Sequence, residues 1–307
     1  MRAKSIATLT VLAALAGLYW WLWLDHRMPA DREFAIDVAE LRRLAGEAGG
    51  AKPDAVRFEK SSALAFTESM IVTGGRWAVV DMPVYAFQLH YPDRTIVVDT
   101  AMDRSLAKPA FLLQSFDDDA YTRVERALDA ASLIVVTHEH FDHSGGLAQH
   151  PRLAQVWPAV RLTETQLAHV DRMAPATLPQ ALLDEADALR YERYHALAPG
   201  VVLIKSPGHT PGSQMVYVQL ADGRELLLLG DVAWKQRNLD LVRERPRFVT
   251  ALLIREDREA VHAQLRALHR LAREQPTIRQ VPGHDAGVID ALAAEGLLQP
   301  GFVLPPT

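Results

Sequence analysis

The chain has no cysteine among its 307 residues. No disulfide can therefore form, and any zinc site that depends on a thiolate ligand is excluded. The chain also lacks a basic stretch, and its formal net charge is −5, which argues against nucleic acid as a partner. Low-complexity tracts, internal repeats and linkers are missing after residue 60. Because 49% of the residues are hydrophobic and strand and helix patterns alternate, we expect residues 61–307 to form one large α/β domain.

Charge is absent from residues 6–24, a run of nineteen positions that follows Arg2 and Lys4. A helix of this length can span a bilayer, and aromatic residues gather at its far end, as is typical of the lipid headgroup level. Residues 1–28 are therefore predicted to be a membrane anchor that leaves the following domain outside the cytoplasm, on the periplasmic side. The alternative is a signal peptide cleaved after small residues near 14–16, which would release a secreted protein.

Residues 29–60 are expected to connect this segment to the domain. Apolar residues recur at helical spacing between positions 31 and 45, and Asp31 is a candidate N-cap, so an amphipathic helix is predicted there. Gly49 and Gly50, followed by Pro53, end the pattern.

The most informative motif is a cluster of histidines and carboxylates directly after the apolar run 133–136. This run predicts a buried strand, so His138, His140, Asp142 and His143 are placed on the loop that follows its end. Imidazoles and carboxylates are the ligands that zinc and similar divalent cations use when no thiolate is present. A glycine pair at 145–146 is expected to let the backbone turn into the next helix.

Three further strand patterns each end in one side chain of the same kind. His209 follows the apolar run 201–204, Asp231 follows 225–229, and His284 follows 278–281. A rigid strand can hold such a side chain while the loop beside it remains open to substrate. Together with the first cluster, the sequence offers seven candidate ligands, which is enough for two metal ions.

This pattern resembles the metallo-β-lactamase-fold hydrolases, from about residue 84 to His284. The resemblance implies an α/β fold of the αββα type, a four-layer sandwich, and two divalent metal ions, most often zinc with iron or manganese as alternatives. Asp99 matches an acidic residue that supports the site in this family, although Ala101 stands where the family commonly has glycine. Carried over residue by residue, the resemblance assigns His138, His140 and His209 to the first metal, Asp142, His143 and His284 to the second, and Asp231 to both.

Within this group the chain is most similar to N-acyl-homoserine lactonases, in residues 82–87, 206–212 and an insert predicted to be helical at 163–197. In the family such an insert helps wall an apolar groove, which makes Met173, Pro175 and Leu178 candidate substrate contacts. The bridging Asp231 is absent from true β-lactamases, and the helical substrate domain of glyoxalase II is missing after His284. Many lactonases have tyrosine three residues after the bridging aspartate. This chain has Trp234 there, a candidate for stacking on an apolar substrate.

The resemblance implies hydrolysis of a lactone or ester by a hydroxide that two metals share. Asp142 is the candidate residue that carries the proton to the departing alkoxide. Three alternatives stay open: hydrolysis of a thioester or phosphodiester, a single-iron oxidoreductase similar to persulfide dioxygenases, and a non-catalytic binding protein on the same scaffold. The expected partners are a small, partly apolar substrate and the membrane.

Overall fold

Two mixed β-sheets form the centre of the molecule in the computed structural model, which describes residues 2–29, 31–108 and 113–304. The first sheet has the order β11-β1-β2-β3-β5, with β4 paired to β1, and the second has the order β10-β9-β8-β7-β6. The first contains β1 (Ala55–Thr67), β2 (Val79–His90), β3 (Thr95–Val98), β4 (Leu113–Phe116), β5 (Leu133–Val135) and β11 (Leu298–Pro300). The second contains β6 (Tyr194–Ala198), β7 (Val201–Lys205), β8 (Gln214–Gln219), β9 (Glu225–Leu228) and β10 (Ile278–Val281).

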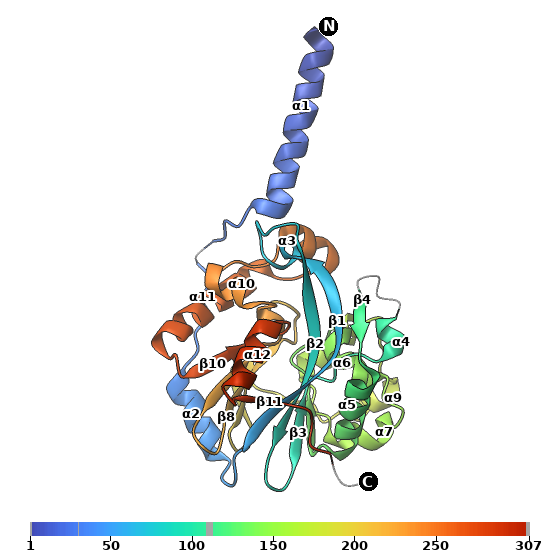
Figure 1. The fold of residues 1–307 in the computed structure, drawn as a ribbon, viewed down its shortest axis with the longest axis vertical. Helices are drawn as coiled ribbons and strands as arrows, with labels where there is room; N and C mark the ends of the chain where they lie inside the picture. Colours follow the sequence, from blue (N-terminus) through green and yellow to red (C-terminus); the bar gives the residue numbers. More distant parts are fainter. Residues whose placement is uncertain (1, 30, 109–112, 305–307) are drawn as a thin grey trace.

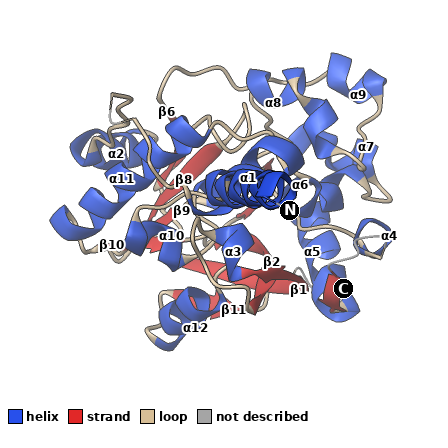
Figure 2. Cartoon of the chain, turned by 90° about the horizontal axis from the view of Figure 1, so that it is seen from above, coloured by secondary structure: helices blue, strands red, loops and turns tan. Residues whose placement is uncertain are grey.

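Helices lie on both outer faces of the sheet pair, with α2, α10 and α11 on one side and α4 to α7 on the other (Figure 1). Figure 2, which looks along the N-terminal helix, shows the same division. The helices and turns of the first half are α1 (Arg2–Tyr19), η1 (Trp20–Leu24), α2 (Val38–Glu47), α3 (Glu68–Ile71), α4 (Arg104–Ala107), α5 (Asp118–Ala130) and α6 (Phe141–Ala148). Those of the second half are α7 (Leu153–Val156), η2 (Trp157–Ala159), α8 (Glu164–Ala168), η3 (Val170–Met173), α9 (Gln180–Asp184), η4 (Gly230–Val232), α10 (Gln236–Leu241), η5 (Phe248–Leu253), α11 (Arg258–Glu274) and α12 (Ala286–Ala294).

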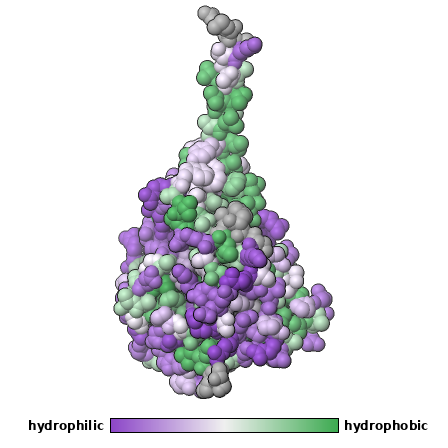
Figure 3. Space-filling model, turned by 45° about the vertical axis from the view of Figure 1, so that its right-hand side comes forward, coloured by the Kyte–Doolittle hydropathy of each residue, from purple (hydrophilic) through white to green (hydrophobic). Residues whose placement is uncertain are grey.

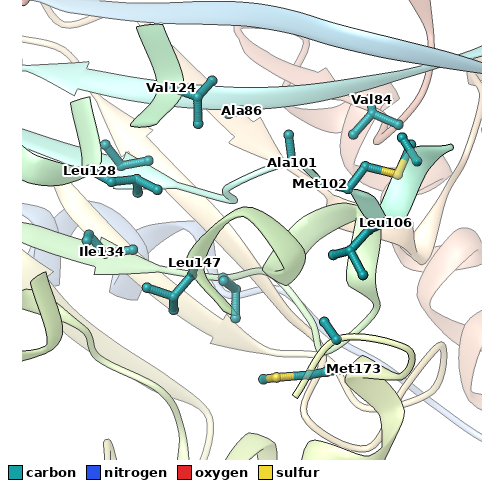
Figure 4. Packing of buried hydrophobic residues seen from close by; sticks show 14 of the residues in the cluster. Val84, Ala86, Ala101, Met102, Leu106, Val124, Leu128, Ile134, Leu147 and Met173 are labelled. Atoms are coloured by element: carbon teal, nitrogen blue, oxygen red, sulfur yellow. The ribbon is translucent and has the colours of Figure 1, made fainter. Parts of the chain in front are cut away.

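Alternation along the strands explains the four layers, because successive side chains of a strand point to opposite faces. In β2, Val84 and Ala86 pack outward against helices α4, α5 and α6, as Figure 4 shows. Tyr85 and Phe87 point inward and meet the second sheet. In the second sheet, residues such as Val202 face outward against α2 and α11. The predicted αββα sandwich is confirmed.

The N-terminal helix stands away from the sandwich (Figure 1). Among the described residues, Lys4–Leu24 is the helix long and apolar enough to cross a membrane, with a mean hydropathy of 1.6 and none of it buried. A signal sequence has the same properties, so length and composition leave both predicted roles open.

Three sequence predictions about the bounds of elements and of the domain need correction. The amphipathic helix begins at Val38 rather than near Asp31, because the Asp37 side chain accepts a hydrogen bond from the Glu40 amide and caps it there. The insert at 163–197 is not continuously helical: it contains the short α8, η3 and α9 and then enters strand β6. Pro175 and Pro179 interrupt it, since proline lacks the amide donor that a helix needs.

The third correction concerns the domain boundary at residue 61. Strand β1 begins at Ala55 and pairs with β2 from there onward, so residues 55–60 are part of the sheet and not of the linker. Helix α2 also packs on the second sheet through Leu41 and Ala45. The linker is therefore shorter than the sequence indicated.

Candidate metal centre

The histidine-rich loop follows strand β5 as predicted and is fixed by a buried aspartate. Asp99, at the end of β3, accepts hydrogen bonds from the Thr137 amide at 2.6 Å and the Thr137 hydroxyl at 2.9 Å. His140 stands at the N-cap position of α6, which carries Asp142 and His143 in its first turn. The loop thus turns into a helix that presents the second half of the motif.

The glycine pair at 145–146 lies inside α6 and not in a turn before it, which corrects the sequence prediction. A Cβ at Gly146 would lie 2.0 Å from the carbonyl oxygen of Thr100, and one at Gly145 would lie 2.6 Å from Leu106. The glycines therefore allow α6 to approach the turn after β3 closely. Ala101 in that turn has a φ of 55°, the conformation that the family's glycine would adopt without strain.

Three histidines meet one oxygen of Asp231 and form the first ligand set. His140 Nδ1 lies 3.2 Å from His138 Nε2 and 2.9 Å from His209 Nε2. Asp231 Oδ2 lies 3.2 Å from His209 Nε2 and 3.7 Å from His138 Nε2. Four donor atoms from three separate strand ends therefore converge on one point.

The other oxygen of Asp231 faces the second set. Asp231 Oδ1 lies 3.3 Å from His143 Nε2 and 3.1 Å from His284 Nε2. Asp142 Oδ2 lies 3.7 Å from the same nitrogen of each histidine. The two oxygens of one carboxylate thus point to two neighbouring groups of donors, which is the arrangement that a bridging ligand requires.

The outer ring nitrogens of four of these histidines have their own partners. His138 Nδ1 contacts the Thr137 hydroxyl at 3.1 Å, and His143 Nδ1 contacts Asp99 Oδ2 at 2.8 Å. His209 Nδ1 contacts Glu256 Oε2 and His284 Nδ1 contacts the carbonyl oxygen of Pro83, both at 2.8 Å. Such contacts fix the tautomer and orient the inner nitrogen of a metal-binding histidine.

The electrostatics of the site also fit a divalent cation. Burial and the neighbouring imidazoles lower the pKa of His138 and His140 well below the usual value, which keeps both in the neutral form that binds metal. Burial lowers the pKa of His143, but the carboxylates of Asp231, Asp142 and Asp99 outweigh it and hold that pKa well above the usual value. A cation in the second set would take the place of that proton.

Asp231 itself supplies a structural test of the fit. Its Oδ1 is buried and accepts no well-aligned hydrogen bond from the described residues, although the ring nitrogens of His143 and His284 lie within 3.3 Å of it. Such an arrangement is costly unless another group satisfies the oxygen. A Cβ at position 283 would lie 2.4 Å from this oxygen, so Gly283 leaves room for it. The donor set and this oxygen fit a pair of metal ions, as the sequence predicted, with the seven residues brought together from four strand ends.

Two residues beside the centre were missed by sequence reasoning. Glu256 accepts hydrogen bonds from His209 and from Arg245 Nε at 2.7 Å, and all three side chains are buried. Burial raises the pKa of Glu256, but the charge of Arg245 and the contacts with His209 together outweigh it, and the pKa lies below the usual value. Neither residue follows a strand or belongs to a motif, so no local sequence signal marks them.

Trp234 lies at the centre, but its polar edge is already engaged. Its Nε1 donates a hydrogen bond to Asp231 Oδ2 at 2.6 Å, and the Arg245 guanidinium stacks over its ring at 4.7 Å. The ring also lines a cavity of about 540 Å³. Trp234 can therefore offer an apolar face to a substrate while it helps orient Asp231.

The cavity is lined by candidate metal ligands and by apolar side chains. Four candidate ligands line it, His140, Asp142, Asp231 and His284, together with the charged Asp171, Arg172 and Arg255. Most of the remaining lining is apolar and includes Leu64, Phe66, Met70, Met82, Val249, Leu253 and Ile254. The structure does not bring Met173 to this cavity. That side chain is fully buried in the core beneath α4 and α6, and its neighbour Ala174 is the residue that lines the cavity (Figure 4).

Comparisons with known proteins agree with this geometry. A sequence model of the Metallo-beta-lactamase superfamily matches residues 79–284. An N-acyl homoserine lactonase of Bacillus thuringiensis is 23% identical over 178 residues, which is 53% of this chain and 68% of the relative. A solved N-acyl homoserine lactone hydrolase with N-hexanoyl-L-homoserine bound at its catalytic metal centre has a TM-score of 0.61 and 19% identity, covering 78% of this chain and 96% of its own. A probable metal-dependent hydrolase from Staphylococcus aureus has a TM-score of 0.57 and 11% identity, covering 77% and 91%.

Proposed function

The chain belongs to the Metallo-beta-lactamase superfamily, and on that premise we propose that it is a dinuclear metal-dependent hydrolase that opens a lactone or ester bond. Superfamily membership and the lactonase relatives show that the chain is a hydrolase similar to lactonases. The proposal adds two metal ions per chain and the cleavage of a lactone or ester bond.

The observation that carries the proposal is the position of Asp231 between two sets of donors. Its two oxygens lie within 3.3 Å of histidine nitrogens in both sets. When bound, two divalent cations lower the pKa of water and polarise a carbonyl oxygen; zinc suits these nitrogen and oxygen donors, and iron or manganese also binds them.

The residues of the chain supply the rest of the reaction. Asp142 is partly exposed and lines the cavity, so it can pass a proton to the alkoxide oxygen that leaves the opened ring. Phe66 and Trp234 form an edge-to-face aromatic pair, with ring centres 5.6 Å apart, in the same cavity, and an apolar acyl group can pack against it. These features favour a substrate that carries an apolar acyl group.

The test is elemental analysis of the full chain in detergent, combined with turnover of a panel of lactones, thioesters and phosphodiesters. We expect about two metal ions per chain and lactone hydrolysis that a chelator abolishes. His140→Ala should lose bound metal and lactone hydrolysis. His195→Ala, on strand β6 away from the centre, should keep its metal content and its hydrolysis. A single iron with oxygen-dependent turnover would support the oxidoreductase alternative, and a protein without metal would refute the site.

We also propose that α1 is retained as an anchor and that the domain lies outside the cytoplasm. Arg2 and Lys4 precede the apolar run, which favours a cytoplasmic N-terminus. Extraction of membranes with alkaline carbonate and protease treatment of spheroplasts, in which the periplasmic face of the inner membrane is accessible, test this proposal. An anchored domain outside the cytoplasm stays with the membrane and is digested, whereas a cleaved signal leaves a shorter, soluble product.

A further inference from the structure

Four exposed apolar side chains gather where the N-terminal helix meets the domain. More than half of each side chain is exposed: 56% of Trp77, 67% of Val79, 65% of Leu252 and 53% of Leu253. We call these four residues the collar. Val79 starts β2 opposite the end of β1, and the two leucines end η5. A domain surrounded by water gains nothing from such exposure, and grouped apolar residues mark contact surfaces.

The collar is continuous with the base of the N-terminal helix. The ring of Trp23 lies 4.7 Å from those of Trp77 and Phe248, and it is stacked on the second. Trp77 Nε1 donates a hydrogen bond to the hydroxyl of Tyr19 at 3.1 Å. In Figure 1 the orange-brown η5 segment and α3 lie directly below this helix, and in Figure 3 its green surface meets the top of a largely purple body.

Arginines mark the same level. The Arg27 guanidinium lies 4.5 Å from the ring centre of Trp20, and that of Arg247 lies 5.4 Å from the ring centre of Trp21. Tryptophan and arginine together are typical of the boundary between hydrocarbon and lipid headgroups. A bilayer that holds the N-terminal helix would therefore reach down to the collar.

The catalytic cavity extends to the collar as well. Leu253 belongs to both, and Val249 and Met70 line the cavity on the way to the metal-type residues. Phe248, one residue before Val249, is the side chain that stacks on Trp23. The short η5 segment therefore has two contacts: it lines part of the cavity, and it packs against the base of the N-terminal helix.

We propose that the collar rests in the surface of the bilayer and that the cavity receives its substrate from the membrane. The substrate would be an amphiphile, with an acyl chain that partitions into lipid and an ester or lactone headgroup that reaches the metal centre. This inference rests on the proposed hydrolase function and on retention of the anchor. It adds the route of access, because Leu253 lines both the collar and the cavity that holds the candidate metal ligands.

The first test measures contact with lipid and does not depend on activity. Since the chain has no cysteine, Leu252→Cys, Val79→Cys and Val303→Cys each give a single site for an environment-sensitive fluorophore. Val303 is 41% exposed and is the matched control, because it belongs to the segment after β11, which runs to the opposite end of the molecule from α1 (Figure 1). In vesicles of phosphatidylcholine and phosphatidylglycerol, nitroxide-bearing lipids should quench the first two labels and spare the third. Equal quenching at all three sites, or labels shielded from lipid by a second copy, would overturn the proposal.

The second test measures access to the centre. The full chain in vesicles is given a short-chain and a long-chain N-acyl homoserine lactone, which differ in their partition into lipid. The double variant Val79→Ser with Leu252→Ser should slow long-chain turnover by about tenfold, since apolar contact with lipid is lost, and should leave short-chain turnover unchanged. Val303→Ser should alter neither rate. A double variant that slows turnover of both lactones equally would refute access of the substrate from the membrane. A wild-type chain that hydrolyses neither lactone would refute the proposed function, and the quenching experiment alone would then test whether the collar contacts lipid.

Discussion

Replacement of Glu256 by glutamine tests whether the buried pair beside His209 supports metal binding. Glu256→Gln keeps the shape of the side chain but removes the charge that faces His209 Nδ1 at 2.8 Å and Arg245 Nε at 2.7 Å. Partners that orient a metal-binding histidine are worth about 10–100-fold in affinity. The variant also leaves the Arg245 guanidinium buried without its counter-ion, at a cost of about 3–5 kcal/mol in the free energy of unfolding.

The affinity is measured by competition with a chromophoric chelator, and the stability of the metal-free chain by urea unfolding, both in detergent. Glu244→Gln is the matched control, because Glu244 is equally buried and pairs with Arg258 without touching a candidate ligand. The control should lose stability and keep its metal affinity. If Glu256→Gln binds metal within about twofold of the wild type, or if both variants weaken binding alike, the reasoning from His209 is refuted.

Three further predictions concern the fold and the centre. Gly146→Ala should lower the free energy of unfolding by about 3 kcal/mol in urea titrations, because its Cβ would overlap a backbone oxygen. Gly46→Ala, with open space at its helical position, should be neutral or stabilising. Burial raises the pKa of Glu225, but hydrogen bonds from Arg42 and Tyr217, together with the charge of Arg42, outweigh it and hold the pKa below its usual value. A depressed pKa stabilises the fold fully above pH 4.5 and progressively less below it, so Glu225→Gln should flatten the loss of stability when unfolding is measured at pH 3 to 5. Asp142→Asn should reduce the metal content from about two toward one and lower turnover by about tenfold or more; full occupancy with full turnover would show that this carboxylate is not needed.

The sequence was sufficient to place the candidate ligands, because each follows a short apolar run that could only be a buried strand. His209, Asp231 and His284 come directly after β7, β9 and β10, where strand ends share one edge. At the end of a strand, the hydrophobic pattern of the sequence therefore also predicts where a residue lies in the fold. The αββα architecture followed from the resemblance that this set of residues carries.

Other features depended on contacts between distant segments and were out of reach. The start of α2 is set by which of two aspartates, Asp31 or Asp37, can accept from the following amides. From the sequence alone, Gly146 is predicted to be a turn residue. Its actual role depends on the turn after β3, which packs closely against it. Glu256 and Arg245 acquire their role only because two loops bring them to His209.

The division of the candidate ligands between the two sheets bears on how the protein matures. His138 to His143 follow a strand of the first sheet, whereas the remaining three follow strands of the second. Contacts between segments so far apart in sequence form late in folding, since closing long loops costs entropy. Metal would then bind late, after the two sheets have packed together. Its binding would stabilise the folded state and link the two sheets. For a chain that emerges across a membrane, this order means that the cation is taken up at the destination and need not travel with the unfolded chain.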